Sequence, residues 1–124
     1  MKIKAYTLFT PSHKKFLYEY LLDSFKYNEN IELTIINKPQ LCETAEFGTD
    51  GWHGTMYYKA NCFYDKLKEC GDDEIFMFID PDIVIYRDFY DDIVERMKTN
   101  DMVFQNDGPG GVNTGFFAVK NNKK

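Results

Sequence analysis

The sequence predicts an α/β domain built on a mostly parallel β-sheet with helices on both faces. Apolar runs of strand length alternate with segments whose apolar residues recur at helical spacing. Such alternation is typical of units in which consecutive strands run parallel and a helix connects them. The clearest run is Ile75–Ile79, because five consecutive apolar residues are typical of a strand buried on both faces. We therefore expect this strand to be central.

The first part of the chain predicts a strand, a helix and a second strand. Residues 2–9 are apolar enough for the first strand. Thr10 and Pro11 mark a helix start, since threonine is a good N-cap and proline fits the first helical turn. The helix should continue to about residue 27. β-Branched residues at positions 31–36 predict the second strand.

The remaining part predicts one long helix, four strands and a short helix. Residues 37–54 show no periodicity, and so long a segment without regular structure is usually functional. The long helix should cover residues 55–70 and stop before Gly71, a common helix terminator. After Ile75–Ile79 we expect a strand over 83–86, a helix over 91–99, a strand over 101–105, a glycine-rich loop over 106–112 and a strand over 114–119.

Composition indicates a globular protein and argues against several classes. Hydrophobic residues make up 44% of the 124 residues, enough for one packed core. A net charge of −5, with Lys123 and Lys124 as the only basic pair near the end, argues against a nucleic-acid partner. No apolar run approaches the ~20 residues of a membrane span, and no signal peptide opens the chain. Cys42, Cys62 and Cys70 form no Cys-x-x-Cys pair, so we expect reduced thiols and a cytoplasmic location.

Two carboxylates, Asp80 and Asp82, directly follow the apolar strand. Pro81 cannot donate to a strand ladder, so the carboxylates should lie at the carboxyl end of a central strand, where open α/β sheets bind ligands. Side chains two residues apart in an extended segment point the same way. Two such oxygen ligands suit Mg²⁺ or Mn²⁺ carrying a substrate diphosphate. The alternative is a solvated turn closed by the aspartates' own hydrogen bonds.

Lys59 and Asn113 are further candidates for binding an anionic ligand. Lys59 lies at the edge of the apolar stripe of the long helix, near Met56 and Phe63. On position alone we favour snorkelling, in which the lysine stem packs and the ammonium reaches water. The glycines before Asn113 allow a ligand close to the backbone, and its amide both donates and accepts hydrogen bonds. An ordinary turn before a strand explains the same residues.

Four segments together resemble the nucleotide-diphospho-sugar glycosyltransferases of the GT-A fold, especially the glycogenin-like group. In chain order they are Tyr6-Thr-Leu-Phe-Thr10, Tyr58-Lys59-Ala-Asn-Cys-Phe, Phe78-Ile-Asp80-Pro-Asp82-Ile-Val-Ile and Val112-Asn113-Thr114-Gly115. They are similar to the base-binding strand, the helix with a donor-directed lysine, the Asp-x-Asp motif and the Asn-Ser/Thr-Gly strand. They occur in the family's order over nearly the whole chain.

The resemblance implies a Rossmann-like GT-A domain over residues 1–124 and a metal-dependent transferase that uses a UDP-sugar. The donor-binding residues would be Phe9, Thr10, Lys59, Asp80, Asn113, Thr114 and Gly115, and the ligands of Mn²⁺ or Mg²⁺ would be Asp80 and Asp82. Asp80 would contact the ribose and the metal, and Asp82 would be the firmer metal ligand. Lys59 would face the diphosphate or the sugar, and Asn113 would bind sugar hydroxyls. No residue is assigned a catalytic role.

One departure from the family concerns the part beyond the Asn-Thr-Gly strand. In the family, that part supplies a third metal ligand, usually histidine, and most of the acceptor site. Here nine residues follow Gly115, and His13 and His53 both precede the aspartates. We therefore expect a truncated or split transferase that binds its donor and transfers sugar poorly, unless a partner subunit or a second copy completes it. The donor sugar, the acceptor (a sugar, a glycan or a protein) and the stereochemistry stay open.

Two other functions stay open on the sequence. One is a non-catalytic module that binds sugar nucleotides or another protein, which the short part after Gly115 favours. The other is a haloacid-dehalogenase-like phosphatase, because Asp80, Asp82 and Val84 match the Asp-x-Asp-x-Thr/Val motif whose first aspartate attacks phosphorus. That motif normally opens the chain, whereas here it lies two-thirds along.

Overall fold

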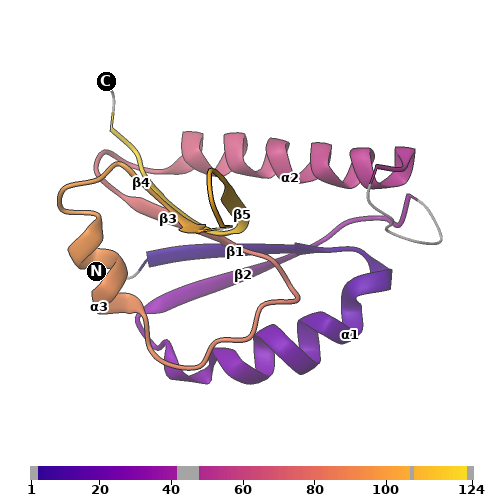
Figure 1. The fold of residues 1–124 in the computed structure, drawn as a ribbon, viewed down its shortest axis with the longest axis horizontal. Coiled ribbons are helices and arrows are strands. Elements are labelled where there is room, and N and C mark those ends of the chain that lie inside the picture. Colours follow the sequence, from indigo (N-terminus) through magenta and orange to yellow (C-terminus); the bar gives the residue numbers. More distant parts are fainter. Residues whose placement is uncertain (1–2, 42–47, 107, 123–124) are drawn as a thin grey trace.

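A computed structural model describes residues 3–41, 48–106 and 108–122, which form an α/β arrangement of a five-stranded mixed sheet and three helices (Figure 1). The strands are β1 (Ile3–Phe9), β2 (Ile31–Asn37), β3 (Ile75–Ile79), β4 (Met102–Asn106) and β5 (Val112–Lys120). The helices are α1 (Lys14–Phe16), α2 (Asp50–Glu69) and α3 (Tyr90–Arg96). The predicted α/β class is therefore confirmed. Cys42, which we predicted to be a reduced thiol, lies outside the described residues.

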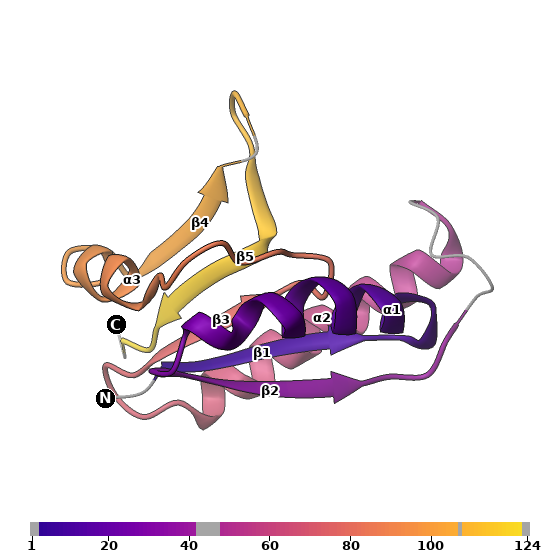
Figure 2. The ribbon, with the colours of Figure 1, turned by 90° about the horizontal axis from the view of Figure 1, so that it is seen from below.

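The sheet has a parallel half and an antiparallel half. Its strand order is β2-β1-β3-β5-β4, with β1 parallel to both β2 and β3. β5 is antiparallel to both β3 and β4, because a turn containing Gly108 and Gly110 at positive φ returns the chain beside β4. The sheet is thus mixed, whereas the sequence predicted a mostly parallel one. Figure 2 shows the β4–β5 hairpin rising away from β1 and β2.

β3 is the central strand, as predicted, and separates two apolar clusters. Its alternate residues Ile75, Met77 and Ile79 pack with Leu17, Leu21, Ile93 and Met97 of the helical segments on one side. Its other residues, Phe76 and Phe78, pack with Cys62, Phe63 and Leu67 of α2. Figure 1 shows α2 along one side of the strands and α1 along the other. All five residues of β3 are buried, which explains why the run contains no polar residue.

The segment after β1 is helical, as predicted, but it is not one regular α-helix. A 3₁₀ turn, η1 (Pro11–His13), precedes α1, and a π-helical turn, η2 (Leu17–Leu22), follows it. A second 3₁₀ turn, η3 (Phe25–Tyr27), completes the segment. Leu17 and Leu21 are buried, so the segment is held by packing on the sheet.

α2 begins at Asp50, five residues before the predicted start. Thr49 caps it, because the Thr49 hydroxyl accepts a hydrogen bond from the Trp52 backbone N–H at 3.3 Å. Trp52 and His53, which the sequence left in an aperiodic segment, therefore lie in the first turn of α2. The glycines in these first turns have low helix propensity, which concealed the helix in the sequence.

The predicted strand over residues 83–86 is wrong, since this segment pairs with no described strand. The Ile83 N–H donates to the Asp80 carbonyl at 3.2 Å, and two backbone donors in and just after the segment bond to side chains. The Ile85 N–H donates to Ser24 Oγ at 2.8 Å, and the Phe89 N–H donates to Asn28 Oδ1 at 3.1 Å. Ile85 and Phe89 are buried in the cluster on the α1 side, so the apolar residues serve packing.

Thr7 in β1 provides a test of core packing. Its side chain is fully buried, and its hydroxyl has no hydrogen-bond partner among the described residues. Burying an unpaired hydroxyl costs about 1–3 kcal/mol. We expect Thr7→Val to raise the free energy of unfolding by about 1 kcal/mol in urea denaturation, because it keeps the shape and removes the hydroxyl.

The control is the same change at Thr34 in β2, where the side chain is exposed. Thr34→Val should change the free energy of unfolding by less than about 0.5 kcal/mol. A loss of stability in Thr7→Val would show that the hydroxyl is bonded in the folded protein.

Candidate functional site

The sheet topology brings three of the four predicted site segments to one edge. β1 and β3 are parallel, so Thr10 and Asp80, which follow them, lie at the same end of the sheet. β5 is antiparallel to β3, so its beginning lies at that end too. The Asp80 N–H donates to the Gly115 carbonyl at 2.7 Å, which joins the end of β3 to β5. The carboxyl ends of parallel strands are where α/β sheets bind ligands.

A pocket of about 140 Å³ opens at this edge between β1, β3 and α2. Five predicted site residues line it: Phe9, Thr10, Lys59, Asp80 and Asp82. The other lining residues are Leu8, His13, Trp52, Thr55, Met56, Phe78 and Pro81. His13 and Trp52 are not among the site residues that the sequence predicted. The available signal for His13 was its position three residues after Thr10, in the turn that follows β1.

Lys59 forms an ion pair with Asp80 inside this pocket. Lys59 Nζ lies 2.9 Å from Asp80 Oδ1, and the two side chains are 10% and 33% exposed. The ammonium also lies over the ring of Phe78, 4.9 Å from its centroid. Phe78 and Asp80 share one face because they are two residues apart in an extended segment. Snorkelling, which position alone favoured, is therefore wrong, since the ammonium is buried against a carboxylate.

Burial dominates the electrostatics of Asp80. Loss of solvent raises the pKa of Asp80 above its ordinary value, and the positive charge and hydrogen bond of Lys59 lower this pKa only in part. The neighbouring Asp82 carboxylate raises the Asp80 pKa further, and His13 lowers it slightly. The pocket therefore holds a carboxylate whose charge a single lysine does not fully stabilise, and an added cation would stabilise it.

Gly115 allows β5 to pass directly beneath the Asp80 carboxylate. A Cβ at position 115 would lie 2.6 Å from Asp80 Oδ2 and 2.8 Å from Asn113 Oδ1, closer than real Cβ contacts. Asn113 Oδ1 accepts a hydrogen bond from the Gly115 N–H at 2.7 Å. Neither Asn113 nor Thr114 lines the pocket, and Thr114 is exposed. The Asn-Thr-Gly segment thus lies beside the pocket and supports Asp80.

The pocket can supply two carboxylates to a metal ion. Among residues 3–41, 48–106 and 108–122, no three His, Cys, Asp or Glu side chains are grouped closely enough to hold a metal by themselves. Mg²⁺ is commonly held by one or two carboxylates together with substrate phosphates and water. Asp80 and Asp82 line the same pocket, so their donor set fits an ion that arrives with a diphosphate.

No protein-family model, curated protein or solved structure matches this chain. In the part of the chain that the structure describes, no helix has the length and apolar character needed to cross a membrane.

The ion pair predicts how the pKa of Asp80 changes when Lys59 is replaced. We expect Lys59→Met to raise the pKa of Asp80 further, because it removes the charge and the hydrogen bond that lower it. Carboxyl-carbon NMR across a pH series in metal-free buffer measures this pKa. Lys66→Met, on the same face of α2 two turns later, should leave the Asp80 pKa unchanged.

The same shift predicts the sign of a pH dependence of stability. Because the pKa of Asp80 is higher in the folded protein than in the unfolded chain, the folded state holds the proton more tightly. The contribution of Asp80 to the free energy of unfolding should therefore fall as pH rises from the ordinary pKa of aspartate to the raised pKa of Asp80 in the folded protein. This fall should be larger in Lys59→Met. A titration of Asp80 below the ordinary aspartate range would show that Lys59, not burial, dominates.

Proposed function

We propose that this chain binds a nucleotide-diphosphate sugar, with UDP as the nucleotide, and acts in glycosyl transfer as a metal-dependent transferase. The observation that carries the proposal is the burial of Lys59 against Asp80, in a pocket that Asp82 also lines, at the carboxyl end of the central strand. One cationic donor and two oxygen ligands at the same point suit a metal-bound diphosphate.

Charge explains why the donor would bind with a cation. The protein carries a net charge of −5, and the pocket itself contains two carboxylates. A bare diphosphate would therefore be repelled. Mn²⁺ or Mg²⁺ held by the carboxylates would turn this repulsion into attraction, and Lys59 adds a positive charge to the same pocket.

The size of the pocket limits which part of the donor enters it. Small-molecule pockets usually measure about 300–1,000 Å³, and this one measures about 140 Å³. We infer that it holds the cation and the diphosphate, while the base and the sugar lie along the neighbouring surface. We expect Phe9 and Thr10, at the end of β1, to contact the base. We expect the beginning of β5, next to Asp80, to contact the sugar.

The residues of the pocket would then have distinct roles in transfer. A bound cation would supply Lewis-acid stabilisation of the charge that develops on the leaving nucleoside diphosphate. Asp80 and Asp82 would hold the cation, and the absence of a side chain at Gly115 leaves room for the Asp80 carboxylate. Lys59 Nζ would donate to a phosphate oxygen of the bound donor, and the ring of Phe78 supports the ammonium.

The GT-A fold belongs to this proposal. Its support is the location of the four family-like segments: on β1, on α2, after β3 and on β5. Asp80 connects three of them, through its pairing with Lys59 and its backbone hydrogen bond to Gly115. A Rossmann-like arrangement would correspond to the parallel half of the sheet, formed by β2, β1 and β3.

A non-catalytic sugar-nucleotide-binding module is the second candidate, and the small volume of the pocket favours it. A phosphatase with Asp80 as nucleophile is less favoured by the geometry. Asp80 Oδ1 is paired with the Lys59 ammonium, which lowers the nucleophilicity of the carboxylate that would have to attack phosphorus. Hydrolysis of p-nitrophenyl phosphate that is lost in Asp80→Asn would favour the phosphatase.

Donor binding should depend on the metal. UDP at ~100 times its dissociation constant, with Mn²⁺, should raise the free energy of unfolding by about 2.7 kcal/mol. Thermal unfolding monitored by calorimetry measures this, and a chelator should abolish it. Asp82→Asn should also abolish it, because the change removes a ligand charge with little change in volume.

The matched control is Asp101→Asn, which removes an exposed carboxylate outside the pocket and should retain the response. Equal stabilisation by UDP with Mn²⁺ and with chelator would contradict the metal role of Asp80 and Asp82.

Turnover separates a transferase from a binding module. We expect slow release of UDP from at least one UDP-sugar when Mn²⁺ and simple sugar acceptors are present, and loss of that release in Asp82→Asn. A coupled assay of UDP formation over a panel of donors measures it. Metal-dependent stabilisation without any UDP release over the panel would favour the binding module instead.

A further inference from the structure

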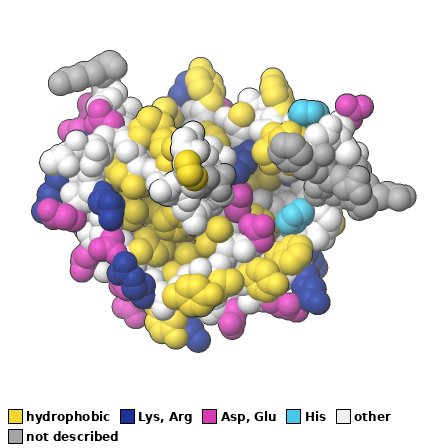
Figure 3. Space-filling model, viewed as in Figure 1, with side chains coloured by type: hydrophobic (Ala, Val, Ile, Leu, Met, Phe, Trp, Pro, Cys, Tyr) yellow, Lys and Arg dark blue, Asp and Glu magenta, His cyan; other side chains and the backbone are white. Residues whose placement is uncertain are grey.

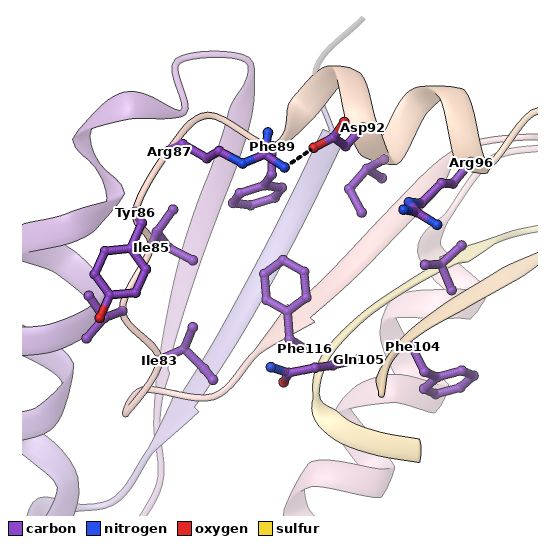
Figure 4. A pocket seen from close by; sticks show the side chains of 13 residues that line it. Ile83, Ile85, Tyr86, Arg87, Phe89, Asp92, Arg96, Phe104, Gln105 and Phe116 are labelled. Atoms are coloured by element: carbon purple, nitrogen blue, oxygen red, sulfur yellow. Dashed lines mark ion pairs between the residues drawn. The ribbon is translucent and has the colours of Figure 1, made fainter. Parts of the chain in front are cut away.

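A second hollow lies between residues 83–89, α3 and the β4–β5 hairpin (Figure 4). Its volume is about 520 Å³, within the ~300–1,000 Å³ that is usual for pockets that bind small molecules. Most of its lining is apolar, including Ile83, Phe89, Val103 and Phe116. The roles proposed above for the pocket at Asp80 do not use it.

The floor of the hollow is an open apolar surface. Phe116 rises from β5 into the hollow and meets Phe89 edge to face, with ring centroids 5.2 Å apart. Val84 and Tyr86 on its border are 40% and 88% exposed. Figure 3 shows hydrophobic side chains gathered over a broad area of this face of the molecule. A contiguous exposed apolar patch is typical of a binding surface.

Positive charge lies on the rim of this apolar surface. Arg96 projects from α3 beside the hollow, and its guanidinium has no ion pair or hydrogen bond to a described residue. Arg87, on the opposite side, is already paired with Asp92 at 2.6 Å. The side-chain amide of Gln105 adds a donor and an acceptor beside Phe116. One uncompensated cation above an apolar floor suits a ligand with an apolar body and an anionic group.

The hollow adjoins the pocket that contains the two aspartates. Asp82 lines that pocket, and the next residue, Ile83, lines the hollow. Phe116 of the hollow follows Gly115, which packs against the Asp80 carboxylate. A molecule in the hollow would therefore lie beside the proposed donor site, at the sugar end of the donor.

We propose that the hollow binds an amphipathic anion, a molecule with an apolar chain or ring and a carboxylate or phosphate group, and that it is the subsite for an acceptor of this class that also carries a hydroxyl. The acceptor role rests on the proposed function, whereas the binding does not. In the transfer, the acceptor hydroxyl oxygen forms the bond to the anomeric carbon. The bond from that carbon to the diphosphate oxygen breaks, the nucleoside diphosphate leaves with its electron pair, and the hydroxyl proton passes to water.

Titration with decanoate and decyl phosphate, followed by amide proton–nitrogen NMR spectra, tests the binding. We expect saturable shifts at residues 83–86, Gln105 and Phe116 with at least one of them, and the stronger of the two identifies the anionic group. Decyltrimethylammonium, with the same chain and the opposite charge, should bind more weakly. Shifts that are confined to other parts of the chain, or equal binding of the cationic probe, would overturn the proposal.

Two variants test the role of Arg96. Arg96→Gln should weaken binding of the anionic probe about fivefold, which corresponds to an exposed ion pair. Lys98→Gln removes a charge from the same end of α3 but lies outside the hollow, so it should leave the affinity unchanged. Gln105→Trp, at an exposed position, should block the hollow and abolish binding. Equal affinities of Arg96→Gln and Lys98→Gln would overturn the charge assignment.

Asp82→Asn distinguishes this inference from the proposed function, because it should remove the metal-dependent response to UDP and leave binding of the anionic probe intact. A chain that binds UDP with Mn²⁺ but neither anionic probe contradicts the inference and leaves the proposed function standing. If the chain binds an anionic probe but no UDP, the hollow is supported as a binding site and its role as the acceptor subsite is overturned.

Discussion

The ion pair between Lys59 and Asp80 is the contact on which the candidate site depends, because it connects α2 to the end of β3. Removing two charges from water costs several kcal/mol per ion, and the attraction between them returns this only with good geometry. Losing one partner of a fully buried pair destabilises a protein by about 3–5 kcal/mol. The cost here is smaller, since Asp80 is one-third exposed. Such a pair contributes little net stability, which is why we assign it a binding role.

The arrangement of β5 follows from the same contact. A side chain at position 115 would clash with the Asp80 carboxylate and displace it from Lys59. Gly115 has no side chain, so the carboxylate can stay beside Lys59. The antiparallel insertion of β5 between β3 and β4 places Gly115 there. It also places Phe116, the next residue, in the apolar hollow. One short stretch of β5 thus shapes both candidate binding sites.

Features that depend on neighbouring residues were predictable from the sequence. The bounds of β3 and the site of its aspartates follow from five apolar residues and Pro81, a purely local signal. Features that depend on distant residues were not. The side chains of Ser24 and Asn28 accept the backbone N–H groups of Ile85 and Phe89, and residues 83–89 form no strand. Likewise, the burial of Lys59 depends on Asp80, which no helical periodicity reveals.

Paramagnetic broadening by Mn²⁺ tests most directly whether Asp80 and Asp82 hold the metal of a bound diphosphate. The measurement is the loss of amide NMR signals at low Mn²⁺ in the presence of UDP. We expect the first losses at residues 80–82 and at Gly115, with greater selectivity when UDP is added, because the diphosphate completes the ligand set. First losses at the exposed acidic segment of residues 72–74, unchanged by UDP, would contradict the account.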